Sequence, residues 1–336
     1  MMTENLKLVT SKDHVQIAIW EIFDSEKRHD LSNLSAHKAQ NIFLTHGTFS
    51  DKKTCLRIAE YLAALGHRCY IMEWRSHGAS EIPKDKFNFE TIATYDFDAT
   101  FRYLFDDLKL DNLHCVTHSG GGIGLTMFLI QNPLYIDKIN SISMFACQAY
   151  GAALNPISYA RIFAAKLFTQ LFGYIPAKKL NMGPINESYY AMKQWYDWNL
   201  KQNFNSSFIT QNDLNEGNNK GNNESDCKSG NNKNTPHKST AQTVMANTEP
   251  FDYRQHMPKI TTPIYAISAK GDKLISPTRG CQLLFNDFNN PANVFCEYSL
   301  SNGDSDDYTH SRIMTSRNAA KEIWPTVAAW IDKHSS

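Results

Sequence analysis

The stretch Cys115-Val-Thr-His-Ser-Gly-Gly-Gly-Ile-Gly124 is the most fold-specific part of this sequence. Apolar residues flank it, as a buried strand before it and a buried helix after it would require. A serine at a sharp strand-to-helix turn, surrounded by glycines, has the form of a nucleophile elbow. Such a turn exposes the Ser119 hydroxyl at a helix N-terminus, whose free N–H groups favour developing negative charge. Thr117 replaces the first glycine of the usual Gly-x-Ser-x-Gly pattern, so a tight packing turn or a weak phosphate cradle is an alternative at this point.

Length and charge limit the class of protein. The 336 residues can bury a large core, either as one α/β domain or as a domain with an inserted cap. Lys and Arg total 34, as do Asp and Glu, so the formal net charge is zero. A protein that binds the phosphate backbone of nucleic acids is usually basic, so we expect no nucleic-acid partner.

The cysteines and the N-terminus indicate a cytoplasmic protein. The seven cysteines lack Cys-x-x-Cys spacing and lie mostly in apolar runs, which is typical of reduced core thiols. We therefore expect neither a disulfide framework nor a metal site. The N-terminus lacks the basic and apolar regions of a signal peptide, and no apolar stretch of about eighteen residues is available to span a membrane.

Strands and helices alternate along most of the chain, which predicts a parallel sheet with helices on both faces. A strand pair over residues 6–10 and 14–23 precedes the alternation. Besides the strand before Ser119, the predicted buried strands are 41–45, 69–74, 139–147, 263–269 and 293–298. The predicted helices run from about Asp51 to Gly66, over 90–108, from Ser119 to about Asn132, over 277–288 and over 312–333, the last with a kink or a new start at Trp324-Pro325.

The alternation stops near Ala149 and resumes at Thr262. The block between them contains an apolar, aromatic-rich helix, 157–173, and a second aromatic cluster at 189–198. Residues 205–248 are rich in Asn, Ser, Lys and Gly and bury too little apolar surface to offset ordering, so we expect a disordered insertion rather than a binding segment. The predicted organisation is a core in two parts, 1–149 and 258–336, with a block over 150–257 inserted between them.

Three chemically active residues follow three predicted strands, at the sheet edge where α/β proteins bind ligands. They are Ser119, Asp272 and His310. Serine needs a base to become a strong nucleophile, histidine can accept its proton near neutral pH, and a carboxylate fixes the imidazole tautomer. Alone, Asp272 would be a turn residue and His310 a solvated one, but together with the elbow they favour a catalytic triad. The alternative sources of the acid are Asp304, Asp306 and Asp307.

The segment His46-Gly47-Thr48-Phe49 follows an early strand and could complete such a site. A backbone N–H from this loop would join the N–H after the nucleophile in an oxyanion hole. We assign Thr48 and Gly120 to those positions, with Phe49 as a neighbouring candidate. We expect His46 to be a structural hydrogen-bonding residue and His118 to point away from the substrate.

Five short motifs spread over the chain outside 150–257 carry a resemblance to a known family. They are His46-Gly47-Thr48, Glu73-Trp74-Arg75-Ser76-His77-Gly78-Ala79-Ser80, Thr117-His118-Ser119-Gly120-Gly121, Gly271-Asp272 and His310. With the chain order Ser…Asp…His, the sequence resembles the α/β-hydrolase superfamily, particularly its lysophospholipases, monoacylglycerol lipases and serine-aminopeptidase-like hydrolases. Ser76 and Thr117 replace glycines of that branch. The resemblance implies an α/β-hydrolase fold, with a mostly parallel sheet of about eight strands and an inserted helical cap.

The resemblance also implies that residues 150–257 form the cap over Ser119. Its aromatic helices would shape an apolar pocket suited to an acyl chain, or would only attach the cap to the core. We expect substrate contacts from Phe49, Phe163, Leu167, Phe168 and Leu171. The predicted protein is a serine hydrolase that cleaves a small-molecule, lipid-like or acyl ester through an acyl-enzyme, without metal or cofactor and with at most transient membrane-surface contact. Alternatives are an amide or thioester hydrolase, an acyltransferase and a non-catalytic binding relative.

Overall fold

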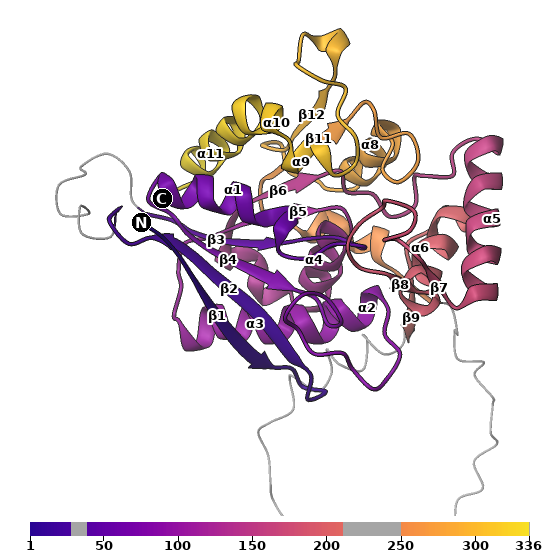
Figure 1. Ribbon diagram of the computed structural model, residues 1–336, viewed down its shortest axis with the longest axis horizontal. Helices are drawn as coiled ribbons and strands as arrows, with labels where there is room; N and C mark the ends of the chain where they lie inside the picture. The colour runs from indigo at the N-terminus through magenta and orange to yellow at the C-terminus, as the bar shows by residue number, and fades with distance from the viewer. Residues whose placement is uncertain (28–38, 211–249, 336) are drawn as a thin grey trace, which may run out of the picture.

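An eight-stranded sheet forms the centre of the molecule (Figure 1). Its strand order is β1-β2-β4-β3-β5-β6-β11-β12. The structure is a computed structural model that describes residues 1–27, 39–210 and 250–335. The strands are β1 (Met2–Thr10), β2 (Gln16–Asp24), β3 (Asn41–Thr45), β4 (Arg68–Glu73), β5 (Leu113–His118), β6 (Ile139–Phe145), β11 (Ile264–Ala269) and β12 (Val294–Tyr298). β1 and β2 pair antiparallel, as do β2 and β4, whereas all strands from β4 to β12 pair parallel. The predicted α/β class with a mostly parallel sheet is therefore confirmed.

Helices cover both faces of this sheet and bury two separate apolar cores. One face carries α1 (Lys53–Ala64), α9 (Arg312–Thr315), α10 (Arg317–Glu322) and α11 (Trp324–Lys333). The other carries α2 (Phe89–Thr91), η2 (Ile92–Phe97), α3 (Asp98–Arg102), η3 (Tyr103–Asp107), α4 (Gly120–Gln131) and α8 (Thr278–Asn286). The short helical turns are η4 (Pro133–Lys138), η5 (Tyr253–Lys259) and η6 (Leu300–Asn302). Because both faces are covered, the central strands β3, β5 and β11 are buried along nearly their whole length.

The C-terminal helical region is divided where the sequence supplies helix starts. A new helix, α11, begins at Trp324, and Pro325 occupies its first turn, where the missing N–H costs nothing. This settles the alternative between a kink and a second helix. A further division falls at Ser316, whose hydroxyl accepts a hydrogen bond from the Ala319 N–H and caps α10.

The block between β6 and β11 lies at the end of the sheet where the parallel strands terminate (Figure 1). It contains α5 (Pro156–Phe172), β7 (Tyr174–Ile175), β8 (Glu187–Ser188), α6 (Tyr189–Lys201), β9 (Asn205–Thr210) and β10 (Pro250–Asp252). The helix α5 starts after Asn155, whose side chain accepts from the Ser158 N–H, and ends at Gly173 with a φ of 78°. No helix among the described residues is long and apolar enough to cross a bilayer.

The predicted insertion over 205–248 begins too early. Residues 205–210 form β9, which pairs antiparallel with β10. The buried Glu90 carboxylate holds this strand, because it accepts hydrogen bonds from the Ser207 N–H at 2.7 Å and from the Ser206 hydroxyl. The strand begins with Asn205-Ser206-Ser207 and is held by a carboxylate distant in the sequence, so the polar composition of 205–248 could not reveal it. The rest of the predicted insertion, 211–248, lies outside the described residues.

Candidate active site

Ser119 lies at a sharp turn between β5 and α4, with φ 53° and ψ −123°. Small residues permit the close approach that this turn requires, since a Cβ on Gly47 would lie 2.6 Å from the Ser119 Cβ. Thr117 is buried at the end of β5, and its hydroxyl donates to the Ser143 carbonyl at 3.4 Å. The elbow geometry is therefore present with a threonine in the place of the first glycine.

The structure brings Ser119, His310 and Asp272 together in one chain of hydrogen bonds. The His310 Nδ1–H donates to Asp272 Oδ2 at 2.6 Å, which leaves Nε2 to accept the Ser119 hydroxyl at 2.9 Å. The three residues follow β5, β11 and β12, whose carboxyl ends meet at the same edge of the sheet. A Cβ on Gly271 would lie 2.1 Å from the Tyr308 carbonyl oxygen, so a glycine is needed where the Asp272 and His310 loops touch.

The surroundings of Asp272 favour the ionised carboxylate next to the His310 imidazole. Burial alone would raise the pKa of Asp272, but the hydrogen bond and charge of His310 and the N–H groups of Ser276 and Ile275 lower it below its ordinary value. The three alternative acids form hydrogen bonds with other groups. Asp304 accepts from the Ser299 N–H, Asp306 from the Tyr308 N–H and Asp307 from the Leu300 N–H. Of the four candidate aspartates, Asp272 is thus the one bonded to the His310 ring.

Two other buried histidines near the serine have structural contacts. The His46 Nδ1–H donates to the Gly47 carbonyl, and its Nε2 accepts the Trp74 N–H at 3.3 Å. The His118 Nε2–H donates to the His310 carbonyl at 2.9 Å, and burial lowers the pKa of His118 to about 3. Both rings are therefore neutral, and His118 supports the backbone of the His310 loop.

Two backbone N–H groups beside Ser119 are available to a ligand. The N–H groups of Thr48 and Gly120 have no acceptor among the described residues, and both residues line the cavity above Ser119. The Phe49 N–H is different, because it donates to Glu187 Oε1 at 3.0 Å. Phe49 lines the same cavity with its side chain.

Glu187 and His77 form a pair that no sequence motif connects. The buried Glu187 carboxylate comes from β8 and accepts from the Phe49 N–H and, at 2.8 Å, from the His77 Nε2–H. The His77 Nδ1–H donates to the Arg75 carbonyl, so both ring nitrogens face acceptors. Burial alone would lower the pKa of His77, but the Glu187 carboxylate raises it. Phe49, with φ 65°, also accepts from the Ile185 N–H, so the block over 150–257 holds this loop from both sides.

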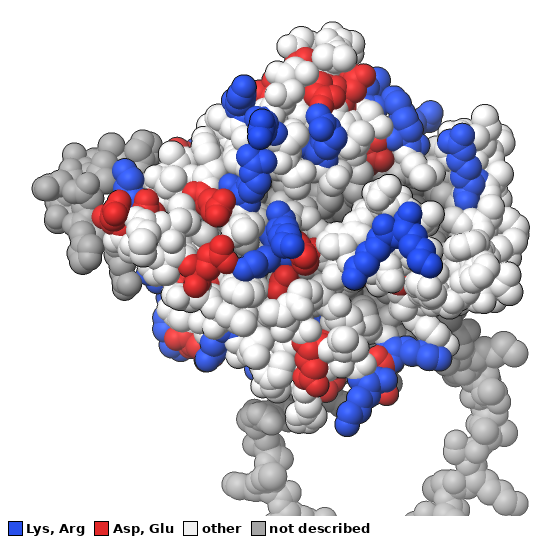
Figure 2. Space-filling model, viewed as in Figure 1, with Lys and Arg blue, Asp and Glu red and all other residues white. Residues whose placement is uncertain are grey.

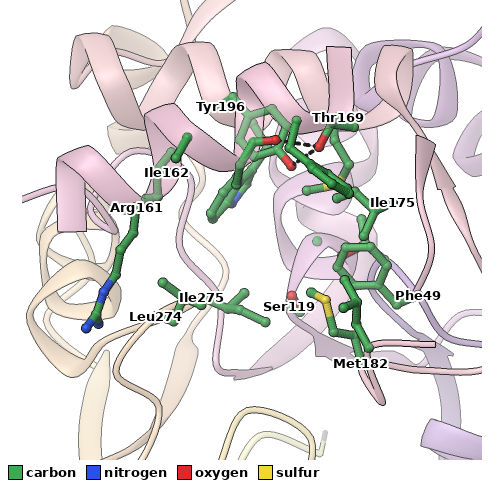
Figure 3. A pocket seen from close by; sticks show the side chains of 18 of the residues that line it. Phe49, Ser119, Arg161, Ile162, Thr169, Ile175, Met182, Tyr196, Leu274 and Ile275 are labelled. Atoms are coloured by element: carbon green, nitrogen blue, oxygen red, sulfur yellow. Dashed lines mark hydrogen bonds between the residues drawn. The ribbon is translucent and has the colours of Figure 1, made fainter. Parts of the chain in front are cut away.

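A cavity of about 550 Å³ lies between Ser119 and α5 (Figure 3). Ser119 lies at one side of it and Ile162 and Thr169 of α5 lie at the other. Its lining is mostly apolar and includes Phe49, Phe89, Ile162, Phe168, Ile175, Leu180, Met182, Met192, Trp195, Leu274 and Ile275. Gln148, Arg161, Thr169 and Tyr196 are among its polar lining residues. No group of three or more His, Cys, Asp or Glu side chains in the described ranges could hold a metal ion.

Of the four α5 side chains expected to contact the substrate, the structure places one at this cavity. Phe168 lines the cavity, whereas Phe163, Leu167 and Leu171 do not and are 46, 51 and 81 % exposed. They lie on the opposite side of the helix from the buried Ile162 and Thr169. Helical spacing showed that these residues share a stripe, but it did not show that the stripe faces outward.

The comparisons with known proteins agree with this architecture. The model of the alpha/beta hydrolase fold family matches residues 40–297, so the chain belongs to that family. A search of the curated proteins found no similar sequence.

Solved structures with the same fold include three esterases. The esterase EaEST from Exiguobacterium antarcticum is 12 % identical, with a TM-score of 0.59, over 97 % of this chain and 98 % of its own. The Pyrococcus furiosus esterase Pf2001 is 14 % identical, with a TM-score of 0.58, over 99 % and 92 %. A thermophilic esterase from Thermogutta terrifontis is 12 % identical, with a TM-score of 0.54, over 99 % and 100 %. Similarity at this level establishes the shared fold.

Proposed function

We propose that the protein is a serine hydrolase that cleaves carboxylic esters of an apolar acyl group through an acyl-enzyme. The observation that carries this proposal is the hydrogen-bonded chain Ser119–His310–Asp272 beside two unoccupied backbone N–H groups. A nucleophile, a base oriented by a carboxylate and two donors for an oxyanion are the groups that acyl transfer needs.

The reaction follows from these positions. The Ser119 oxygen attacks the ester carbonyl carbon while its proton passes to His310 Nε2, and the Thr48 and Gly120 N–H groups stabilise the oxyanion. The intermediate collapses, the alcohol leaves with the proton from His310, and the acyl group stays on Ser119. Water then attacks the acyl-enzyme with His310 as base, which releases the acid and restores the serine. Asp272 holds the Nδ1–H and stabilises the imidazolium throughout.

The cavity supports an apolar acyl group. It is lined by aromatic and aliphatic side chains, and its size falls within the range of cavities that hold small organic ligands. In this proposal residues 150–257 act as a cap, because α5 and α6 supply Ile162, Phe168, Met192 and Trp195 to its lining. A buried sugar has many hydroxyl groups and would find few partners there beyond Gln148 and Arg161, which favours an apolar acyl group.

A fluorophosphonate probe tests the proposal. An activated serine in a formed oxyanion hole should be phosphonylated, and mass spectrometry should place the adduct on Ser119. Absence of both labelling and ester turnover would favour a non-catalytic binding protein. A matched ester, thioester and amide with the same acyl group would show whether the ester is the preferred substrate.

Chain-length preference should be set by the residues that line the cavity. Burial of a methylene contributes about 0.8 kcal/mol, so each carbon that still fits should raise kcat/KM roughly three- to fourfold. Measurements of kcat/KM on nitrophenyl esters with acyl chains of about two to about ten carbons test this expectation. Phe168→Ala should move the maximum to longer chains because it enlarges the cavity. Leu171→Ala is the matched control on the same helix and should not move it; a flat series for every variant would contradict the acyl-pocket assignment.

Glu187 should act as a positioning residue for the Thr48–Phe49 loop. Glu187→Ala removes the acceptor of the Phe49 N–H and the partner of His77, so kcat should fall on the order of 10²-fold as the Thr48 N–H loses its place. Glu187→Gln keeps one acceptor and should recover part of the activity. The measurements are kcat, KM and melting temperature.

Asp197→Asn is the control for this prediction, because it removes a carboxylate of α6 that pairs with Lys166 and Lys193. It should leave kcat unchanged. An equal loss of kcat in both variants would mean that Glu187 acts only through general stability.

A further inference from the structure

The outer side of α5 is an apolar surface without a partner among the described residues. We define the apolar α5 face by its exposed side chains, Ile157, Phe163, Leu167, Leu171 and Phe172. Leu171 is 81 % exposed, and its neighbours Phe163 and Leu167 precede it at intervals of four residues. A helix on the surface of a soluble protein normally turns polar side chains outward, so a contiguous apolar patch of this kind indicates an interaction site.

This face is continuous with the mouth of the cavity above Ser119. Phe168, Leu180 and Met182 each line the cavity and are also 39 to 55 % exposed at the surface. Met182 lies beside Phe49 and near Ser119 in Figure 3, while α5 crosses the opposite wall. A partner that covers the apolar α5 face would therefore also cover the entrance to the cavity.

The chain segment that contains the face has only basic residues among its charged side chains. Between Tyr150 and Asn186 the chain has no aspartate or glutamate, but it has Arg161, Lys166, Lys178 and Lys179. The following acid, Glu187, is buried, and Asp197 pairs with Lys166. In Figure 2 the end of the molecule that carries α5 is largely uncharged, with Lys and Arg side chains on it. An apolar face bordered by cations is complementary to a layer of anionic lipid.

Two other occupants fit this surface less well. A second copy of the chain would bring the same lysines against each other, which disfavours association. Residues 211–249 are mostly Asn, Ser, Lys, Gly, Asp, Glu and Thr and offer few apolar side chains to cover the face.

We propose that the apolar α5 face docks onto anionic lipid surfaces, with Lys178 and Lys179 at the headgroups and the cavity mouth facing the acyl layer. Docking stands on the exposed face and its charges alone, whereas delivery of an ester from the lipid to Ser119 rests on the proposed function. The substrate delivered in this way would be an acyl ester dissolved in the lipid layer.

Vesicle flotation with the full chain tests the docking. The vesicles contain about 30 % phosphatidylglycerol in phosphatidylcholine, or phosphatidylcholine alone. The triple variant Phe163→Gln/Leu167→Gln/Leu171→Gln should bind the anionic vesicles at least about tenfold more weakly, because apolar burial is lost. Leu6→Gln/Leu134→Gln/Leu300→Gln alters three exposed leucines elsewhere and should bind normally. Lys178→Gln/Lys179→Gln should remove the preference for anionic vesicles.

The outcomes separate docking from catalysis. Ser119→Ala should bind vesicles as the wild type does, and the α5 triple variant should keep its kcat/KM on a soluble acetate ester but lose activity on esters in vesicles. Wild-type binding that the α5 triple variant does not weaken would overturn the proposal. A dimer that the triple variant dissociates would also overturn it, because the face would then join two copies of the chain. The same holds if the protein binds vesicles only after residues 211–249 are excised.

Discussion

Ser119→Ala should abolish ester hydrolysis, with a loss of roughly 10⁴-fold or more in kcat. The hydroxyl is the atom that would bond to the acyl group, and no other group takes its place at the end of β5. Removing one oxygen from an elbow that already fits closely against Gly47 should leave the fold unchanged. Steady-state kinetics on a nitrophenyl ester, with the melting temperature measured on the same preparation, check both statements.

The control for this prediction is the fluorophosphonate probe, which should label the wild type and not Ser119→Ala. A folded Ser119→Ala protein with near-wild-type turnover would remove Ser119 from the mechanism.

Asp272→Asn should lower kcat by about 10⁴-fold while the protein stays folded. The asparagine amide can donate to His310 Nδ1, which places the proton on Nε2, where it can no longer accept from Ser119. The variant also leaves the imidazolium without its counter-charge. Kinetics on a nitrophenyl ester measure the loss, and the melting temperature checks the fold.

Asp307→Asn is the matched control, since Asp307 lies close to His310 in sequence but accepts from the Leu300 N–H. It should keep nearly full activity. A collapse of Asp307→Asn together with a nearly normal Asp272→Asn would reassign the acid.

The sheet and the Ser119–His310–Asp272 chain could be predicted because they depend on local patterns. Buried strands of a parallel sheet are short apolar runs, and the residues that follow them gather at one edge whatever the loops do. The polar residues after β5, β11 and β12 therefore had to lie near each other.

The rest depended on contacts between distant segments. Periodicity showed that Phe163, Leu167 and Leu171 share one side of α5. The side that packs inward is decided by contacts with other elements, such as the hydrogen bond between the buried Thr169 and Tyr196 of α6. Glu187 and Glu90 belong to no local motif, and only the folded chain brings each of them to its donors. Composition correctly marks a segment poor in apolar residues, yet it could not show that β9 is held by hydrogen bonds.

The double attachment of Phe49 has a consequence for engineering this scaffold. The block over 150–257 looks like an exchangeable module, since it is inserted between β6 and β11 of the central sheet. The graft boundary would nevertheless run through the pairs Phe49–Glu187 and Phe49–Ile185. A chimera with a foreign block in this place would leave His77 buried without its carboxylate and the loop before Phe49 without its anchors. An exchange of the block would therefore have to keep Glu187 and the strand around it, or redesign His77 as well.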